Sequence, residues 1–85
     1  SNQYEVGIKT SNITELQKEL EELYTISPAH FKSLENILKC TIQVDTNNTS
    51  NNLLQYLMSK GQVVHFKEVI PSIHDIFIES VTDHA

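Results

Sequence analysis

Histidine and cysteine are the residues in this chain most able to do chemistry, and their spacing decides which chemistry is open to them. The 85-residue chain has four histidines and one cysteine. A metal carrier built on a Cys-x-x-Cys pair is therefore excluded, and the histidines follow no metal-ligand spacing. Nothing in the order of the residues indicates a serine or cysteine activated by a histidine base. We predict no catalytic residue, no metal site and no cofactor among these candidates, which are His30, His65, His74, His84 and Cys40.

Glycine and arginine content argues against phosphate binding. A nucleotide-binding loop of the form Gly-x-x-x-x-Gly-Lys-Ser/Thr needs two glycines close together, whereas the only glycines are Gly7 and Gly61. The chain has lysines but no arginine, so the acylphosphate-hydrolysing class, which binds phosphate through a loop arginine, is excluded in its usual form. We predict that this chain is not an enzyme and binds no ATP by itself.

Overall charge and hydropathy limit the partners. The formal net charge of −5 at pH 7 opposes binding to nucleic acid and to anionic membranes. No apolar run approaches the roughly 20 residues that a membrane-spanning helix needs, and no signal-peptide pattern is found. Cys40 lies in an apolar alternation, which is typical of a buried small hydrophobe in a reducing compartment. We expect a cytoplasmic domain that binds no nucleic acid and inserts into no membrane.

The strongest local pattern is a helix start close to the end of the chain. Ser72 is placed to accept a hydrogen bond from the backbone of Asp75, and Asp75 to accept one from the backbone of Ser72, which makes a capping box. Pro71 precedes the cap and fixes the entry of the chain. Apolar residues then recur at helical spacing as one stripe, namely Ile73, Ile76, Phe77 and Val81. The pattern predicts a terminal helix that docks on another surface.

The order of residues in this stretch resembles that of a known family. Residues 71–79 read Pro-Ser-Ile-His-Asp-Ile-Phe-Ile-Glu, similar to the Pro-Ser-Leu-Glu-Asp-Ile-Phe segment that closes the ATP-binding subunits of many ABC exporters. The resemblance implies a C-terminal accessory domain that follows a nucleotide-binding core. His74 departs from the family, which has an acidic residue at that position. By this resemblance, the family-motif and docking residues are Pro71, Ser72, Ile73, Asp75, Ile76 and Phe77.

The resemblance also implies protein partners and a role. The partners would be the parent ATPase core, the second ATPase subunit or the membrane permease, at the inner face of the membrane, and a homodimer is left open. The role would be assembly, or coupling of ATP hydrolysis to export. The alternative is a small-molecule regulatory domain of ACT-like type. Such domains carry a glycine-containing loop after the first strand, and Thr10-Ser11-Asn12 has none.

Alternation and helical spacing assign the first elements. Residues 4–9 alternate apolar and polar side chains, which is the period of a strand with one buried face. Asn12, with Glu15 three residues later, caps a helix. The predicted inner stripe of that helix is Ile13, Leu16, Leu20 and Leu23.

The middle of the chain allows two interpretations. Residues 38–44 alternate and predict a strand. Before it, residues 29–33 can form the other arm of a hairpin that turns at residues 34–36. Alternatively, a helix starts at Ser27-Pro28, with helical spacing of Phe31, Leu34 and Leu38. We prefer the hairpin, because the family resemblance implies it.

After an asparagine-rich connector the chain gives another helix and another strand. Thr49 and Ser50 are the candidate caps at the start of the helix and Gly61 is the predicted cap at its end. Its predicted inner face is Leu53, Leu54, Leu57 and Met58. Residues 62–70 predict the last strand. Its two-residue period places the side chains of Val64 and Phe66 on the core side of the sheet. It places those of Val63, His65 and Lys67 on the opposite side.

The succession is β-α-β-β-α-β with an added terminal helix, an α+β fold of the ferredoxin-like sandwich type. Residues 4–85 are expected to form this single accessory domain, and residues 1–3 to be a cloning remnant with a disordered start. Two helices would cover one face of the sheet and leave a polar face. Gly7 lies on that polar face, and a strand glycine indicates a close approach. We expect Phe77 or Ile73 of the terminal helix to fill that space.

Overall fold

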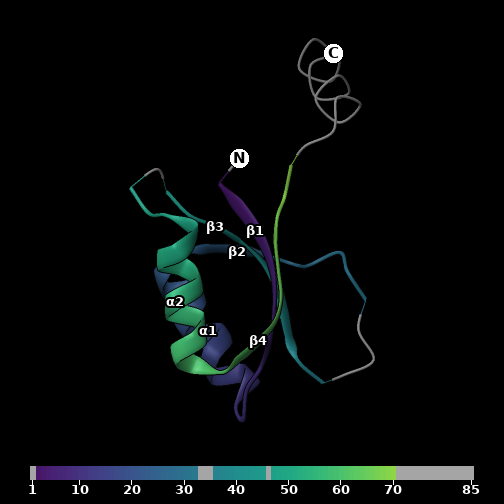
Figure 1. The fold of residues 1–85 in the computed structure, drawn as a ribbon. Helices are drawn as coiled ribbons and strands as arrows, with labels where there is room; N and C mark the ends of the chain where they lie inside the picture. The colour runs from purple at the N-terminus through teal and green to yellow at the C-terminus, as the bar shows by residue number, and fades with distance from the viewer. Residues whose placement is uncertain (1, 33–35, 46, 71–85) are drawn as a thin grey trace, which may run out of the picture.

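The computed structural model describes residues 2–32, 36–45 and 47–70 of the chain. In this part, four strands and two helices follow one another in the order β-α-β-β-α-β that the sequence pattern indicates (Figure 1). The elements are β1 (Gln3–Lys9), α1 (Ile13–Leu23), β2 (Thr25–Ser27), β3 (Leu38–Gln43), α2 (Ser50–Lys60) and β4 (Gln62–Glu68).

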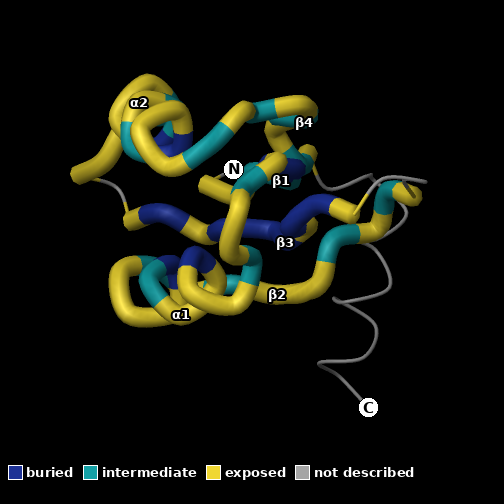
Figure 2. Tube along the Cα trace, turned by 90° about the horizontal axis from the view of Figure 1, so that it is seen from below, coloured by how far each residue is buried: buried dark blue, intermediate teal, exposed yellow. Residues whose placement is uncertain are grey.

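The strands form one antiparallel sheet in the order β2-β3-β1-β4. Both helices lie on the same side of the sheet, and the connection between β2 and β3 runs on the other side (Figure 1). In the view from below, α1 lies beside β2 and α2 beside β4, with the buried stretch of β3 between them (Figure 2). The fold is therefore α+β with two layers. Asn2 and Gln3, which the sequence places in an unordered start, are tied to the sheet, because their carbonyls accept hydrogen bonds from the backbone N–H groups of Val44 and Val69.

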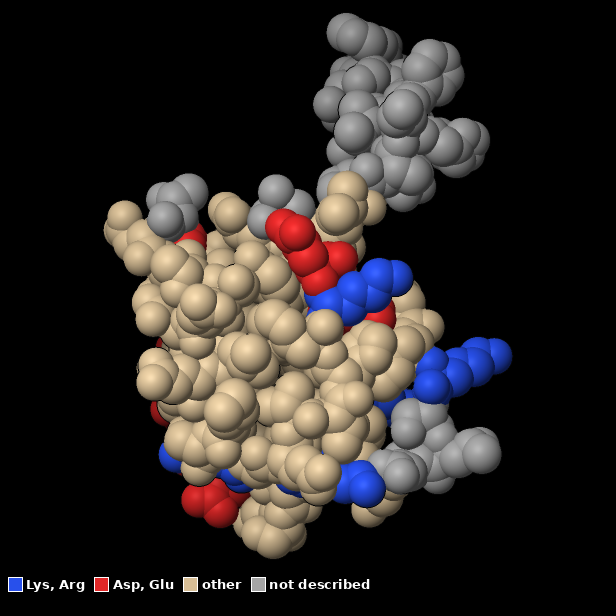
Figure 3. Space-filling view, viewed as in Figure 1, with Lys and Arg blue, Asp and Glu red and all other residues tan. Residues whose placement is uncertain are grey.

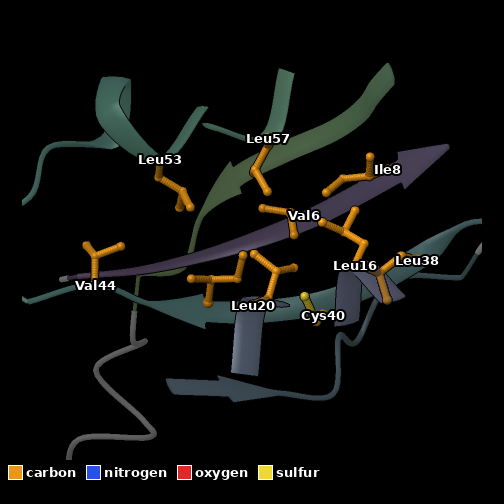
Figure 4. Packing of buried hydrophobic residues seen from close by; sticks show 10 residues of the cluster. Val6, Ile8, Leu16, Leu20, Leu38, Cys40, Val44, Leu53 and Leu57 are labelled. Carbon is orange, nitrogen blue, oxygen red and sulfur yellow. The ribbon is translucent and has the colours of Figure 1, made fainter. Parts of the chain in front are cut away.

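The core lies between the sheet and the two helices (Figure 4). Alternate residues of β1 and β3 point to the helix side, and each helix contributes two leucines four residues apart. Removal of these side chains from water is the main stabilising contribution. The buried set is Val6, Ile8, Leu16, Leu20, Leu38, Cys40, Ile42, Val44, Leu53 and Leu57.

Two of the three predicted helix starts are confirmed, and the third, at Ser72, lies outside the described residues. The Asn12 side chain accepts a hydrogen bond from the Glu15 N–H at 3.0 Å, and Thr49 Oγ1 accepts one from the Asn52 N–H at 3.1 Å. These oxygens satisfy backbone N–H groups that the first helical turn leaves without a partner. At the other end of α2, the Gly61 N–H donates to the Leu57 carbonyl.

The predicted inner faces of the helices are too wide. Leu23 is 57% exposed and Met58 is 61% exposed, so neither belongs to the core. Leu23 is the last residue of α1, beyond the turn that packs on the sheet. Tyr56, whose ring is partly buried, packs against the core instead and meets Tyr24 edge-on at 6.3 Å between ring centres.

The strand before β3 lies earlier than predicted. Residues 29–32 are neither strand nor helix, and β2 is instead Thr25–Ser27, whose Ile26 pairs with Ile42 of β3. Pro28 follows directly and has no N–H to continue the pairing. The alternative helix starting at Pro28 is also absent from the described residues, and Leu38 begins β3. Residues 33–35 of the expected turn lie outside the described part of the chain.

The orientation predicted for β4 is wrong at its start. Gly7 pairs with His65, but the next residue, Ile8, pairs with Val63. Val64 is thus an extra residue in β4, which is a β-bulge, and a bulge interrupts the two-residue alternation of side chains. As a result Val63 and Phe66 both pack against the core, whereas Val64 is 41% exposed.

Candidate interaction surface

The sheet face opposite the helices, called here the outer face, is built from two cross-strand rows. In one row Gly7 of β1 lies between Lys39 of β3 and His65 of β4. In the next row Glu5 lies between Thr41 and Lys67, again on one face of the antiparallel sheet. The prediction that this face is polar is therefore confirmed for these six residues.

A short segment of the β2–β3 connection covers part of the outer face. This segment, called here the strap, is residues 28–32. The His30 N–H donates to Glu5 Oε2 at 3.2 Å, and Thr41 Oγ1 donates to the Pro28 carbonyl at 3.4 Å. The Phe31 ring stacks on the His65 ring at 4.0 Å between ring centres. Two long hydrogen bonds and one ring contact thus hold the strap.

Gly7 is explained by this cover. A Cβ atom at Gly7 would lie 2.9 Å from Phe31 Cζ, 3.0 Å from Ile37 Cδ1 and 3.2 Å from His65 Cβ. The close approach expected from a strand glycine is confirmed. Among the described residues, Phe31 and Ile37 make this approach. Phe77 and Ile73, which the sequence analysis expects there, lie outside the described part of the chain.

Glu5 is the electrostatic centre of the outer face. Its side chain is only 13% exposed, and Oε1 lies 3.0 Å from His65 Nε2. Burial by itself raises the pKa of this carboxyl. The hydrogen bonds from the His30 N–H and from His65, with the positive charges of His65 and Lys67, outweigh burial, so the pKa of Glu5 is lowered from its ordinary value. The Glu5 carboxylate is therefore held in its charged form.

The candidate residues for chemistry are a cysteine and four histidines, and the structure describes Cys40, His30 and His65. Cys40 is buried as predicted, and burial raises the pKa of its thiol to about 11, which leaves no reactive thiolate at neutral pH. Within residues 2–32, 36–45 and 47–70, no three His, Cys, Asp or Glu side chains gather as metal ligands. Over the same residues, no helix is long and apolar enough to span a membrane.

Two surface hollows bear on small-molecule binding. One of about 200 Å³ lies at the loop after β1 and is lined partly by Thr10, Ser11 and Asn12. Another, of about 360 Å³, lies between α1 and the end of β2, beside Ile26, Pro28 and Cys40. Neither has a convergent set of buried polar groups such as orients a small ligand.

The predicted docking residues lie beyond the part of the chain that the structure describes. They are Pro71, Ser72, Ile73, Asp75, Ile76 and Phe77. The described residues instead bring together a group that the sequence did not single out, Glu5, His30, Phe31 and His65. Two signals for it exist in the sequence: Gly7 marks the site of close approach, and strand alternation puts Glu5 and His65 on one face.

Comparison with known proteins gives one family. A family model described as "ATP-binding protein DrrA1-3-like, C-terminal domain" matches residues 1–81. No curated protein and no solved structure matches the chain.

Proposed function

The chain belongs to the family of DrrA1-3-like ATP-binding protein C-terminal domains, and we propose that it serves assembly or coupling between an ABC exporter ATPase and its membrane partner. The observation that carries the proposal is the family match over residues 1–81. It agrees with the resemblance of residues 71–79 to the segment that closes such ATP-binding subunits. The domain would act in the cytoplasm, at the inner face of the membrane.

A non-catalytic role is the second part of the proposal. The family match is to a C-terminal domain and not to the ATP-binding cassette. A phosphate-binding loop also cannot form from Gly7 and Gly61, which are far apart in the sequence. The ATPase activity would belong to the parent subunit, and this domain would work through protein contacts.

The architecture we propose is ferredoxin-like with an added terminal helix. The strand order β2-β3-β1-β4, antiparallel throughout, is what two interleaved β-α-β units produce. The capping pair Ser72 and Asp75 and the apolar stripe after it support a helix beyond β4. That helix would dock through Ile73, Ile76 and Phe77 on the ATPase core, the second ATPase subunit or the permease.

An ACT-like effector domain is the weaker alternative. The hollow at the loop after β1 measures about 200 Å³, whereas small-molecule sites occupy roughly 300–1,000 Å³. Screening the purified chain for thermal shifts with amino acids and nucleotides tests this alternative. A saturable stabilisation by one of them would favour it over the interaction role.

The decisive experiment removes residues 3–85 from the full-length ATP-binding subunit. We expect ATP affinity to be retained while subunit assembly, or export for a given ATPase rate, is weakened. ATP affinity, ATPase rate, co-purification of the permease and export are measured in the truncated and intact transporters. A loss of ATP affinity with assembly and coupling unchanged would overturn the proposal.

A further inference from the structure

Charge is distributed unevenly over this acidic chain. Helix α1 carries four glutamates, whereas four of the six lysines lie on the outer face, at the end of β1 or on the strap. Lysine side chains project from the side of the sheet away from the helices, with acidic side chains beside the uppermost of them, and the surface over α2 shows mostly uncharged side chains (Figure 3). We call these four lysines the basic surface: Lys9, Lys32, Lys39 and Lys67.

The acidic group nearest to this surface is already engaged. Glu5 accepts hydrogen bonds from the His30 N–H and from His65, so its charge is directed into the sheet and strap. Among the described residues, no carboxylate lies within ion-pair distance of Lys32, Lys39 or Lys67. Against burial, which raises it, the pKa of Glu5 is lowered mainly by the hydrogen bonds from His30 and His65, and Lys67 adds a smaller contribution.

The strap adds an aromatic contact to the charge. The Lys39 ammonium lies 6.0 Å from the centre of the half-buried Phe31 ring. That distance is at the limit of a cation–π contact, which leaves most of the ammonium's hydrogen-bonding capacity for another group. A partner carboxylate that reaches Lys39 would also meet the ring and the His65 side chain stacked on it.

We propose that the basic surface binds an acidic segment of a protein partner. A short acidic segment in direct contact with this surface interacts mainly with the nearby lysines. The more distant acidic groups of the chain repel it little, because interactions between exposed charges more than about 8 Å apart are screened at physiological salt. A membrane or a nucleic acid presents a wide field of negative charge, which the net charge of −5 opposes. The chain is acidic overall but basic at this surface. Charge complementarity therefore favours a short acidic protein segment over a membrane or a nucleic acid.

This inference rests on the proposed interaction role and adds a surface and a partner chemistry to it. The two can fail separately. If removal of residues 3–85 impairs coupling but substitution of the lysines does not, the domain still serves the transporter through another surface. If the removal has no effect on assembly or export, the proposed function itself fails.

The test uses the 85-residue chain, labelled with ¹⁵N, and a synthetic peptide of glutamates, with an equally long peptide of lysines as the counterpart. We expect the glutamate peptide to shift the backbone amide signals of Lys39, His65 and Lys67, and the shifts to disappear at high salt. Shifts confined to other parts of the chain, or none, would overturn the proposal. Binding to phosphatidylserine vesicles with none to the peptide would overturn it as well.

A matched pair of variants separates local from overall charge. Lys39→Glu and Lys18→Glu change the net charge equally, but Lys18 lies on the solvent side of α1. Peptide affinity should fall about tenfold or more in Lys39→Glu and less than about threefold in Lys18→Glu. Lys67→Gln, a milder substitution, should also lower the peptide affinity. It keeps the test valid if Lys39→Glu fails to fold. Equal losses in Lys39→Glu and Lys18→Glu would show that only overall charge matters and would overturn the proposal.

Discussion

The carboxylate of Glu5 joins two segments that are far apart in the sequence. It accepts from the His30 N–H of the strap and lies 3.0 Å from His65 Nε2 of β4. Because one negative charge serves both contacts, its protonation weakens them together. The strap should therefore be the first part of the outer face to respond to acid.

Glu5→Gln tests this response. The pKa of Glu5 is lowered in the fold from its ordinary value of 4.5. Its contribution to stability is therefore fully present above pH 4.5 and is lost as the pH falls through the folded-state pKa. The free energy of unfolding of the parent should exceed that of Glu5→Gln above pH 4.5, and the two should converge in stronger acid.

Urea unfolding over a pH series makes this measurement. Glu68→Gln is the matched control, since it removes the same charge from an exposed position of β4. A difference between parent and Glu5→Gln that stays constant with pH would contradict the assigned role of the carboxylate.

Gly7 makes a second prediction at a single residue. Gly7→Val should destabilise the chain by about 1–3 kcal/mol, because a side chain there overlaps Phe31, Ile37 and His65. Gln43→Val is the control at an exposed position of β3, where valine should be neutral or stabilising. Urea melts of both variants give the comparison. If Gly7→Val is as stable as the parent, the strap does not occupy this site in solution.

At the scale of elements, the hydrophobic periodicity of the sequence correctly predicted the regular strands and helices. The alternation of residues 4–9 and 38–44 gave β1 and β3, and the caps Asn12 and Thr49 gave both helix starts. Periodicity failed at Val64, since a bulge depends on how β4 pairs with β1 and not on β4 alone. It also failed for β2, whose three residues are too few to show a period.

The strap could not be predicted from the sequence for a related reason. Residues 28–32 have no regular hydrogen bonding of their own and are held by side chains of β1, β3 and β4. Their position is therefore set by tertiary contacts, which local patterns do not contain. Gly7 shows only that something approaches, without telling which segment does so.

The inner face of α2 gives a prediction from neighbouring residues. Leu57 is fully buried, and Met58, one position along the helix, is 61% exposed. Leu57→Ala should therefore cost about 2–5 kcal/mol, whereas Met58→Ala should cost less than about 0.5 kcal/mol. Thermal or urea melts distinguish them. Similar losses for both would mean that α2 packs with a wider face than the structure shows.

The terminal segment gives a further prediction at this scale. If the predicted helix beyond Pro71 packs against its own domain, Phe77→Ala should destabilise the chain by about 3–5 kcal/mol. Ser72→Ala should cost about 1 kcal/mol through loss of the cap. Both are measured by urea melts of the chain. If Phe77→Ala melts like the parent, the apolar stripe faces a partner instead, and the loss should then appear in co-purification with the permease.

For the whole molecule, the two faces of the sheet have different roles, one in stability and the other in the proposed binding. The helix side supplies the core, with ten buried apolar residues and the acidic α1 on its surface. The outer face contributes little apolar burial and carries lysines, the Glu5–His65 pair and the strap. Substitution of the exposed lysines Lys32, Lys39 and Lys67 can therefore alter binding with small effects on stability, which makes them the practical place to search for partner contacts.

Nucleotide binding is the last prediction, and it concerns the molecule as a whole. Phosphates are bound in proteins by backbone N–H groups of a glycine-rich loop at a helix start, or by arginines that clamp them at two points. The chain has two glycines far apart and no arginine. Its lysines are point charges spread over three strands, both helices and the strap, and such charges give only weak, salt-sensitive attraction. Calorimetric titration of the chain with Mg-ATP at physiological salt should therefore show no saturable heat. Saturable binding at micromolar affinity would contradict the non-catalytic interaction role, whereas weak heat that salt abolishes would be the expected response of the lysines alone.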